Sequence, residues 1–354
     1  MSEAKDIGSG EDEILFHHQD HAGIITLNRP RALNALNLNM VRRMDRQLRD
    51  WADDGAVRHV IIQATPGRAF CAGGDIRAIY DWKKENNPDL LAFYYEEYRL
   101  NHMIKRYAKP YIALIDGIVM GGGVGLSVHG QARIIGNNAL FAMPETGIGF
   151  FPDVGGSYFL PRCPGQSGFY LGLTGARIKS ADMLWAGIAT HHVSSDVLSG
   201  LCDRLAAAEN VDDVIASLGK SAHQKSELSD VSGEIDDVFS RLTMAEILAA
   251  LDASGSEFAQ NTAKTLAAKA PASLCVVLRQ LREGGDLSFE DCMAMEYRLV
   301  SRFVDEHDLF EGIRAVVVEK DGAPKWRPGN LGAVTAAKVD SYFAPLENEL
   351  VFGD

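Results

Sequence analysis

Two glycine-rich loops, each placed between an apolar strand and a helix, constrain the fold of this chain more than any other feature of its sequence. AFCAGGD at 69–75 follows the apolar run VRHVIIQA, and MGGGVG at 120–125 comes shortly after YIALIDG. Both apolar runs are continuous enough to be strands buried on both faces of a sheet. Because strands alternate with helical patterns, we expect an α/β fold in which ligands gather at the loops that leave the strands.

The sequence predicts three parts along the chain. Residues 1–12 are acidic and polar and are expected to be flexible, residues 13–195 carry the alternating strands and helices, and residues 196–354 are mainly helical. The polar, serine-rich run 218–236 is expected to be a surface connection. The other helical patterns of the last part lie around 239–252, 256–268, 271–283, 288–304 and 307–320.

Composition excludes several classes of partner. With 35 Lys and Arg against 48 Asp and Glu, the net charge is -13, which disfavours non-specific binding of nucleic acid. No apolar run approaches the roughly 18 residues of a membrane helix. The paired histidines of HHQDH at 17–21 and of HH at 191–192 would point to opposite faces of a strand, so no metal site is predicted.

The cysteines and the N-terminus bear on the cellular compartment. Five scattered cysteines without a CxxC pair fit a reducing compartment. The start, MSEAKDIGSGEDE, has neither the apolar core of a secretory signal nor the arginine-rich character of a mitochondrial presequence. We therefore expect a cytoplasmic protein, although a mature organellar protein whose presequence has been removed would look the same.

The glycine loops are candidate donors of backbone N–H groups. Gly73 and Gly74 precede a helix that Asp75 can cap, and MGGGVG opens another helix. Glycine lets an N–H come close to a ligand, and the start of a helix leaves N–H groups unpaired. Two such groups on one oxygen form an oxyanion hole, which stabilises an enolate or a tetrahedral intermediate. Either loop alone is better explained as a tight turn, so the prediction rests on the pair.

Two acids stand out in the apolar stretch AMPETGIGFFPDVGG at 142–156. Glu145 and Asp153 are the only carboxylates between Gly117 and Pro161, and each lies at a turn beside a proline. Burial among the neighbouring aromatic side chains would raise the pKa of Glu145 towards neutrality, which suits a base that later acts as an acid. The alternative is that both acids only cap or stabilise turns.

These motifs together resemble one known family. AFCAGGDI, then GIVMGGGVGLSVHG, then LFAMPETGIGFFPDVGGSYFLPR is similar to the crotonase (enoyl-CoA hydratase/isomerase) superfamily, and AMEYRL at 294–299 also matches its 3-hydroxyisobutyryl-CoA hydrolase group. The similarity runs from LNRPRALNALNLNM near residue 27 to EGIRAVVVEKDGAPKW near residue 326. The resemblance implies a crotonase-like α/β spiral of ββα units with a helical C-terminal region.

The resemblance also implies positions for the substrate, an acyl-CoA bound in an extended, hooked shape. The N–H groups of Gly74 and Gly122 would form the oxyanion hole, and Glu97 would line the acyl pocket. Without the resemblance, Glu97 would be read as a solvated acid on a charged helix face. The positions implied to bind CoA are Arg31, Ala32, Asp75, Ile76 and Arg77, with Arg31 as a phosphate partner.

The departures from the superfamily pattern favour hydrolysis. Hydratases of this superfamily carry two glutamates, and the first of these positions is Gly125 here, so only Glu145 remains. Adding water across a double bond needs one acid to activate water and another to protonate carbon, and glycine does neither. Asp153 replaces a glycine that hydratases usually have. It is the natural acceptor for the 3-hydroxyl group of a short acyl chain.

The sequence thus predicts hydrolysis of a short 3-hydroxyacyl-CoA thioester, implied to be 3-hydroxyisobutyryl-CoA in valine breakdown. Glu145 acts either as a general base on water or as a nucleophile. The alternatives are a lyase or isomerase of the same superfamily and a non-catalytic binding protein with this fold. No cofactor is expected beyond the CoA of the substrate. Both a homo-oligomer and a chain whose C-terminal helices fold back on its own core stay open.

Overall fold

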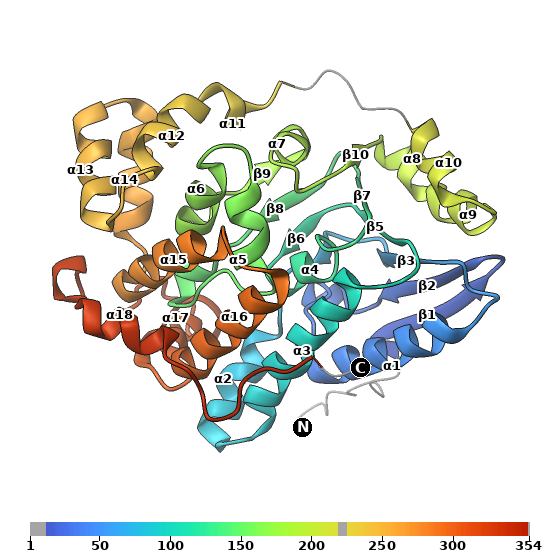
Figure 1. The fold of residues 1–354 in the computed structure, drawn as a ribbon, viewed down its shortest axis with the longest axis horizontal. Helices are drawn as coiled ribbons and strands as arrows, with labels where there is room; N and C mark the ends of the chain where they lie inside the picture. The colour runs from blue at the N-terminus through green and yellow to red at the C-terminus, as the bar shows by residue number, and fades with distance from the viewer. Residues whose placement is uncertain (1–11, 219–224, 353–354) are drawn as a thin grey trace, which may run out of the picture.

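The computed structural model describes residues 12–218 and 225–352 and contains two β-sheets surrounded by helices (Figure 1). The strands are β1 (Ile14–Gln19), β2 (Ala22–Leu27), β3 (His59–Ala64), β4 (Ala69–Cys71), β5 (Tyr111–Ile115), β6 (Ile118–Met120), β7 (Ala132–Ile135), β8 (Leu140–Ala142), β9 (Ile178–Lys179) and β10 (His191–His192). Of the flexible terminus predicted over 1–12, only residue 12 lies inside the described residues.

Helices make up most of the rest. They are α1 (Leu38–Asp53), α2 (Ile76–Glu85), α3 (Asp89–Lys105), α4 (Gly122–Gly125), α5 (Gly156–Phe159), α6 (Ser167–Thr174), α7 (Ser180–Trp185), α8 (Ser195–Ser199), α9 (Leu201–Ala206), α10 (Val211–Ser217), α11 (Glu227–Asp230), α12 (Ser232–Phe239), α13 (Met244–Ser254), α14 (Glu257–Ala267), α15 (Pro271–Gly284), α16 (Phe289–Phe303), α17 (His307–Ile313) and α18 (Ala336–Phe343). Shorter turns are η2 (Pro30–Ala32), η3 (Glu145–Ile148), η4 (Leu160–Arg162), the π-helix η5 (Arg314–Val318) and η6 (Leu331–Ala333).

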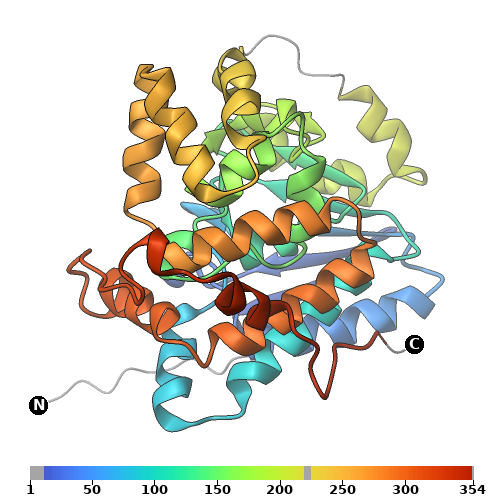
Figure 2. The ribbon, with the colours of Figure 1, turned by 60° about the vertical axis from the view of Figure 1, so that its left-hand side comes forward.

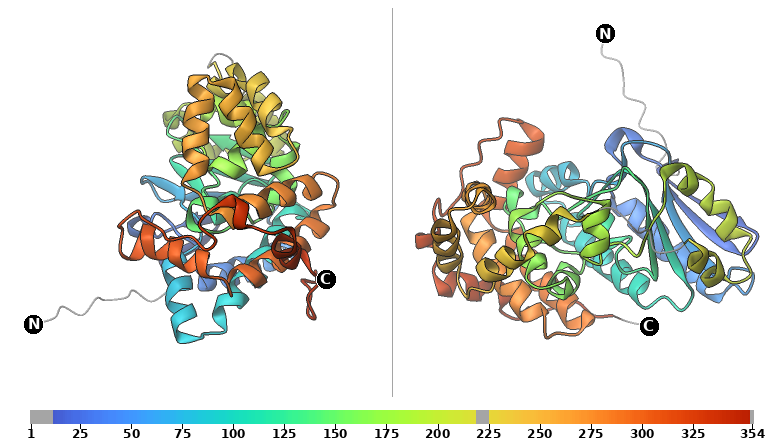
Figure 3. Two further views of the ribbon diagram at one scale, coloured as in Figure 1. Left: turned by 90° about the vertical axis from the view of Figure 1, so that its left-hand side faces the viewer. Right: turned by 90° about the horizontal axis from the view of Figure 1, so that it is seen from above.

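The larger sheet has the strand order β1-β2-β3-β5-β7-β10, and every pair except the hairpin β1/β2 is parallel. Strand β5 is buried along its whole length, as its apolar run predicts. One face of the sheet joins the main core with α1 and α3. The other face packs on α8 to α10, which lie at the end of the molecule opposite the C-terminal helices (Figure 3).

The smaller sheet positions the glycine loops. Its order is β4-β6-β8-β9, in which β4, β6 and β8 are parallel and β9 is antiparallel. Because β4 and β6 are parallel neighbours, the loops that follow them leave the same edge of the sheet. The sequence did not separate β4 from the loop AFCAGGD, since a strand of three residues shows no usable alternation.

Two helices begin at residues whose side chains cap them, and one of these, Asp75, was predicted from the sequence. The Asn37 side chain accepts a hydrogen bond from the Met40 N–H and begins α1, and Asp75 accepts one from the Ala78 N–H and begins α2. The buried side of α1 includes Leu38, Val41, Met44, Leu48 and Trp51, which recur in the sequence at intervals of three and four residues. The Asp75 cap lies where the first glycine loop enters α2.

The C-terminal helices pack directly on the segments that follow the glycine loops. Helix α15 contacts α5 and α6, α16 contacts α3 and α5, and α17 contacts η3. Figure 2 shows the orange α15 and α16 lying across the green and cyan part of the chain. No helix among residues 12–218 and 225–352 is long and apolar enough to cross a membrane. The division into separate domains stays a prediction.

The surface connection predicted over 218–236 is wrong in its second half. Residues 219–224 lie outside the described residues, but α11 and α12 occupy most of 227–239. The Ser226 hydroxyl caps α11 and also donates to Asp182 Oδ1. Ser226 therefore caps a helix. A polar, serine-rich composition alone does not distinguish a capped helix from a loop.

A close approach between α15 and residue 157 makes a stability prediction. A Cβ added to Gly284 would lie 2.0 Å from the Ser157 carbonyl oxygen, so Gly284→Ala must push α15 away from α5. We expect a loss of about 1–3 kcal/mol in the free energy of unfolding, measured by urea denaturation. Gly233→Ala is the matched control, because Gly233 is an exposed residue of α12 with no atom within 4 Å of an added Cβ. An equal effect of the two substitutions would contradict the packing described here.

Candidate active site

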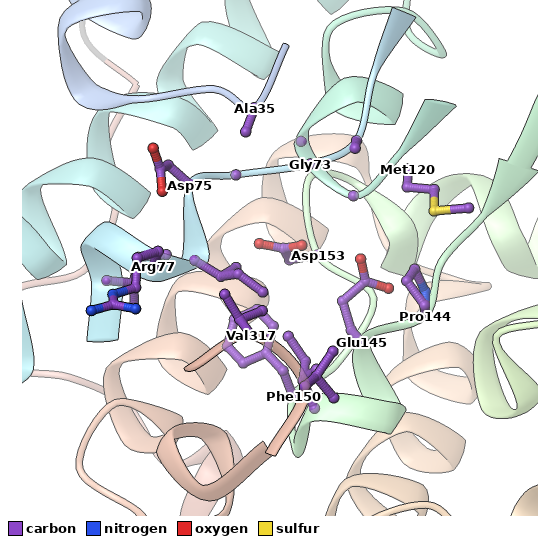
Figure 4. A pocket seen from close by; sticks show the side chains of 18 of the residues that line it. Ala35, Gly73, Asp75, Arg77, Met120, Pro144, Glu145, Phe150, Asp153 and Val317 are labelled. Atoms are coloured by element: carbon purple, nitrogen blue, oxygen red, sulfur yellow. The ribbon is translucent and has the colours of Figure 1, made fainter. Parts of the chain in front are cut away.

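A cavity of about 600 Å³ lies where the two glycine loops, α3, the turn after β8 and the C-terminal region meet. Its lining contains nine of the ten residues that the sequence singled out: Ala32, Gly74, Asp75, Ile76, Arg77, Glu97, Gly122, Glu145 and Asp153. Figure 4 shows Glu145 and Asp153 below Gly73, with Asp75 and Arg77 at the other end of the view. Arg31 is exposed in η2 and, among the described residues, is not part of this lining.

The two glycine loops touch each other at the cavity. A Cβ added to Gly122 would lie 3.3 Å from the Gly74 nitrogen and 2.6 Å from Glu97 Oε1. Gly73 and Gly121 have φ angles of 113° and 46°, which favour glycine. Within the described ranges, the N–H groups of Gly74 and Gly122 have no hydrogen-bond acceptor. The loops therefore present two unpaired N–H groups close together, and any side chain at position 122 would separate them.

Glu145 begins the turn η3 and is held against the second glycine loop. Its side chain is 7% exposed, and its Oε1 lies 3.0 Å from the position of a Cβ on Gly121. The turn is fixed by the hydrogen bonds of Thr146, whose hydroxyl donates to the Leu173 carbonyl and whose carbonyl accepts from the Ala270 N–H. Glu145 Oε2 is buried without a hydrogen-bond partner among the described residues. The carboxylate therefore remains available to a ligand.

Asp153 is the second buried acid, with 5% exposure. The Tyr98 hydroxyl of α3 donates to Asp153 Oδ2 at 3.0 Å. No other side chain of the described chain donates to this carboxylate, so Oδ1 is left for a hydroxyl donor in the cavity. Sequence analysis assigned Asp153 a role but did not identify Tyr98 as its partner.

Glu97 is buried rather than solvated, with 2% exposure. It lies on the apolar side of α3, together with Leu90, Phe93, Tyr94, Tyr98, Asn101 and Ile104. Their spacing of three and four residues is visible in the sequence and is a signal for burial that the charged neighbours obscured. The resemblance placed Glu97 at the acyl pocket, and the structure places it in the cavity lining.

The buried acids shift each other's protonation. Burial raises the pKa of Asp153 to about 7, against the hydrogen bond from Tyr98, which lowers it. Burial also raises the pKa of Glu145 well above its ordinary value, and the Asp153 charge raises it further, while Lys269 lowers it. Burial and then the charges of Asp153 and Glu296 raise the pKa of Glu97. Of the three, Asp153 therefore changes between its acidic and basic forms near neutral pH.

Position 125, to which the resemblance assigns a glutamate in hydratases, is closed. A Cβ on Gly125 would lie 2.7 Å from Val154 Cβ and 2.8 Å from Asn101 Nδ2. Contacts of this length to a Cβ cannot be relieved by rotating a flexible side-chain end. Because Val154 directly follows Asp153, the turn that brings Asp153 to the cavity also fills the space that a side chain at 125 would need.

The cavity also contains positive charges. Lys269, between α14 and α15, and Arg177 line it and were not identified from the sequence, because nothing local distinguishes them from other surface cations. Burial lowers the pKa of Lys269, and the charge of Glu145 raises it. Arg77, by contrast, is paired with Asp81 at 3.0 Å. No group of three or more His, Cys, Asp or Glu side chains suited to a metal occurs in residues 12–218 and 225–352.

Comparison with known proteins agrees with this architecture. A family model described as enoyl-CoA hydratase/isomerase matches residues 22–343. The mitochondrial 3-hydroxyisobutyryl-CoA hydrolase of Xenopus laevis is 48% identical over 334 residues, which cover 92% of this chain and 87% of that protein. This degree of similarity extends through both the strand-rich part and the C-terminal helices.

Solved structures share the fold under different functional names. A carnitinyl-CoA dehydratase from Mycobacterium thermoresistibile is 41% identical with a TM-score of 0.91, covering 96% of this chain and 99% of that one. An enoyl-CoA hydratase from Rhodobacter sphaeroides 2.4.1 is 38% identical with a TM-score of 0.88, covering 94% and 98%. The predicted crotonase-like spiral with a helical C-terminal region is thereby confirmed. Because these names describe different reactions, the residues of the cavity must decide the chemistry.

The raised pKa of Asp153 predicts how stability depends on pH. An aspartate side chain in the unfolded chain has a pKa of about 3.9. Between that pH and about 7, Asp153 is protonated in the folded protein and ionised in the unfolded chain, so folding binds one proton. The stability contribution of this proton is complete below pH 3.9 and is lost as the pH rises through 7. We expect Asp153→Asn to reduce the fall in the free energy of unfolding between pH 4 and 8, measured by urea denaturation. An unchanged pH slope would contradict the raised pKa.

Proposed function

The chain belongs to the enoyl-CoA hydratase/isomerase family, and from that premise we propose that it hydrolyses 3-hydroxyisobutyryl-CoA to 3-hydroxyisobutyrate and CoA. The observation that carries the proposal is the turn at Asp153 and Val154. This turn places a carboxylate in the cavity for a substrate hydroxyl group and closes position 125, where hydration would need a second glutamate. The same turn therefore favours a 3-hydroxyacyl thioester and disfavours addition of water to a double bond.

The two glycine loops stabilise the charge that develops during the reaction. The thioester oxygen accepts hydrogen bonds from the N–H groups of Gly74 and Gly122 and gains negative charge when the carbonyl carbon is attacked. Each donor of this kind contributes about 3 kcal/mol to transition-state stabilisation. The contact between the loops supports this assignment, because both N–H groups are unpaired and lie on one cavity wall.

Glu145 drives the attack on the carbonyl carbon. As a general base it takes a proton from water, the oxygen of that water bonds to the carbonyl carbon, the C–S bond breaks, and the thiolate takes up the proton. As a nucleophile its oxygen bonds to the carbonyl carbon and the C–S bond breaks, which gives an anhydride and the CoA thiolate. The thiolate takes up a proton, and water then cleaves the anhydride to release the acid and restore Glu145. A buried carboxyl group with a raised pKa is suited to both the basic and the acidic step.

Asp153 and Glu97 select the acyl group. Asp153 Oδ1 accepts the hydrogen bond of the 3-hydroxyl group, while Tyr98 holds Oδ2. A site built to bind a hydroxyl group rejects analogues without it, because its own polar group is then left unpaired. Glu97 Oε1 is buried without a partner among the described residues and lies beside Gly122, so it faces the same part of the substrate.

The CoA portion extends away from Glu145 along Ala32, Asp75, Ile76 and Arg77, which line the other part of the cavity. Arg31 is the weakest member of the predicted CoA set, because it lies outside the lining and can reach a phosphate only from the exposed turn η2. No cofactor other than the CoA of the substrate is needed for this chemistry. Valine breakdown as the pathway stays a prediction.

Two other predictions remain open. The cytoplasmic location of this chain stays a prediction, whereas the relatives named 3-hydroxyisobutyryl-CoA hydrolase are called mitochondrial. The C-terminal helices pack on the core of their own chain, and a homo-oligomer stays a prediction.

The second candidate function is that of a hydratase or dehydratase, which is favoured by the names of the two similar solved structures.

Free-thiol release from a small panel of CoA thioesters tests the proposed function. We expect release from 3-hydroxyisobutyryl-CoA, and we expect Glu145→Gln to lower kcat by at least about 100-fold, since general base catalysis contributes that much or more. The exposed Glu257→Gln on α14 is a control for the substitution and should retain activity. A change in acyl unsaturation without free CoA would instead support the hydratase or dehydratase reading.

Lys269 makes a separate prediction for the pH profile of hydrolysis. Its positive charge lowers the pKa of Glu145, so Lys269→Met should move the acidic limb of the kcat/KM profile to higher pH. Lys264→Met is the matched control, because Lys264 is an exposed lysine of α14 outside the cavity. If the acidic limb of both variants lies at the same pH as in the wild type, the charge of Lys269 does not shift the pKa of Glu145.

A further inference from the structure

The backbone immediately after Asp153 adopts a strained conformation. Val154 has a φ of 50°, and Gly155 follows with a φ of 87°. The left-handed region is readily adopted by glycine but is an outlier for a β-branched residue such as valine. Such strain persists only when the surrounding structure holds the backbone in place, and it gathers at functional sites. The turn that presents Asp153 must therefore be held by its neighbours.

Three buried polar side chains hold this turn, each through a hydrogen bond to its backbone. Glu296 of α16 accepts from the N–H groups of Gly155 at 2.8 Å and of Ser157 at 2.9 Å. Gln280 of α15 donates to the Pro152 carbonyl at 2.6 Å and to the Ser157 hydroxyl at 2.8 Å. His129 Nε2 lies 2.7 Å from the Val154 carbonyl oxygen.

An apolar residue would pack at position 296 better than Glu296 does. It is 0% exposed and lies on the buried side of α16, among Phe289, Cys292, Met293, Leu299, Val300 and Phe303. No Lys or Arg of the described chain forms an ion pair with it. A buried carboxylate is costly unless hydrogen bonds compensate, and the two N–H groups of the turn are the bonds that it has.

Glu296 therefore acts on the cavity through the turn rather than by touching a ligand. It is absent from the cavity lining, whereas Asp153, two residues before Gly155, belongs to it. We propose that Glu296 is a positioning residue for substrate selection, which fixes the Val154 turn so that Asp153 meets the 3-hydroxyl group of the acyl chain. This inference rests on the proposed thioester hydrolysis and adds the origin of its selectivity.

Glutamine at position 296 can accept only one of the two hydrogen bonds that Glu296 accepts from the turn. A glutamine side chain has the length of glutamate but one acceptor oxygen in place of two, so either Gly155 or Ser157 loses its partner. The turn then moves away from its strained conformation, and Asp153 moves with it. The effect falls on the contact with the 3-hydroxyl group and leaves the two glycine loops and Glu145 in place.

The test compares 3-hydroxyisobutyryl-CoA with isobutyryl-CoA, which lacks only the hydroxyl group. We expect Glu296→Gln to lower the ratio of the two kcat/KM values by about 10-fold or more, because the hydroxyl contact carries the discrimination. The loss should fall on the hydroxylated thioester, with the value for isobutyryl-CoA within about threefold of wild type. A purely structural role would lower both values together and leave the ratio unchanged.

Glu290→Gln is the matched control on the same helix. Glu290 lies near the surface, where it pairs with Arg106 and His102, and it does not contact the Val154 turn. Its substitution should leave the ratio at the wild-type value. If Glu296→Gln does not fold, Glu296→Asp replaces it, because the shorter carboxylate cannot reach both N–H groups and should also lower the ratio.

The outcomes separate this inference from the proposed function. A folded Glu296 variant that keeps the wild-type ratio, in an enzyme that hydrolyses 3-hydroxyisobutyryl-CoA, overturns the inference and leaves the function intact. Absence of free thiol with the wild-type protein overturns both. A fall in the ratio that is equal in Glu290→Gln also overturns the inference, since it would then follow from the charge of α16 alone.

Discussion

The close approach of the two glycine loops is the contact on which the rest of the site depends. The loops leave the parallel neighbours β4 and β6, and at Gly122 even a methyl group would collide with Glu97 and approach the Gly74 nitrogen. The absence of side chains there lets two N–H groups face one atom of a ligand. Glu145 Oε1 lies beside Gly121, so the acid and the N–H groups share one wall of the cavity.

The C-terminal helices complete this wall from the other side. Lys269 brings a charge to the cavity, while Gln280 and Glu296 hold the strained turn after Asp153. These residues are more than 110 positions from Asp153 in the sequence. The helical region thus contributes side chains to the cavity and to the turn beside it, in addition to covering the core.

Sequence reasoning succeeded where the signal is local. Asn37 and Asp75 mark helix starts by their capping chemistry, and the apolar runs mark β3 and β5. It found which loops and turns carry the site, partly through family resemblance. It missed the three-residue strand β4, the position of Lys269 in the cavity and the hydrogen bonds of Glu296 to the turn after Asp153, because these depend on contacts between distant segments. The role of Arg31 as a phosphate partner stays a prediction, since Arg31 is exposed in η2 and is not among the residues that line the cavity.

Polarisation of the thioester carbonyl is the central physical claim, and infrared difference spectroscopy measures it directly. The Glu145→Gln variant would be mixed with a CoA thioester carrying a ¹³C label at the carbonyl carbon, so that turnover does not consume the ligand. Hydrogen bonds from Gly74 and Gly122 weaken the C=O bond. We expect a band at lower frequency in the complex than in free thioester. A bound thioester with an unshifted band would contradict it.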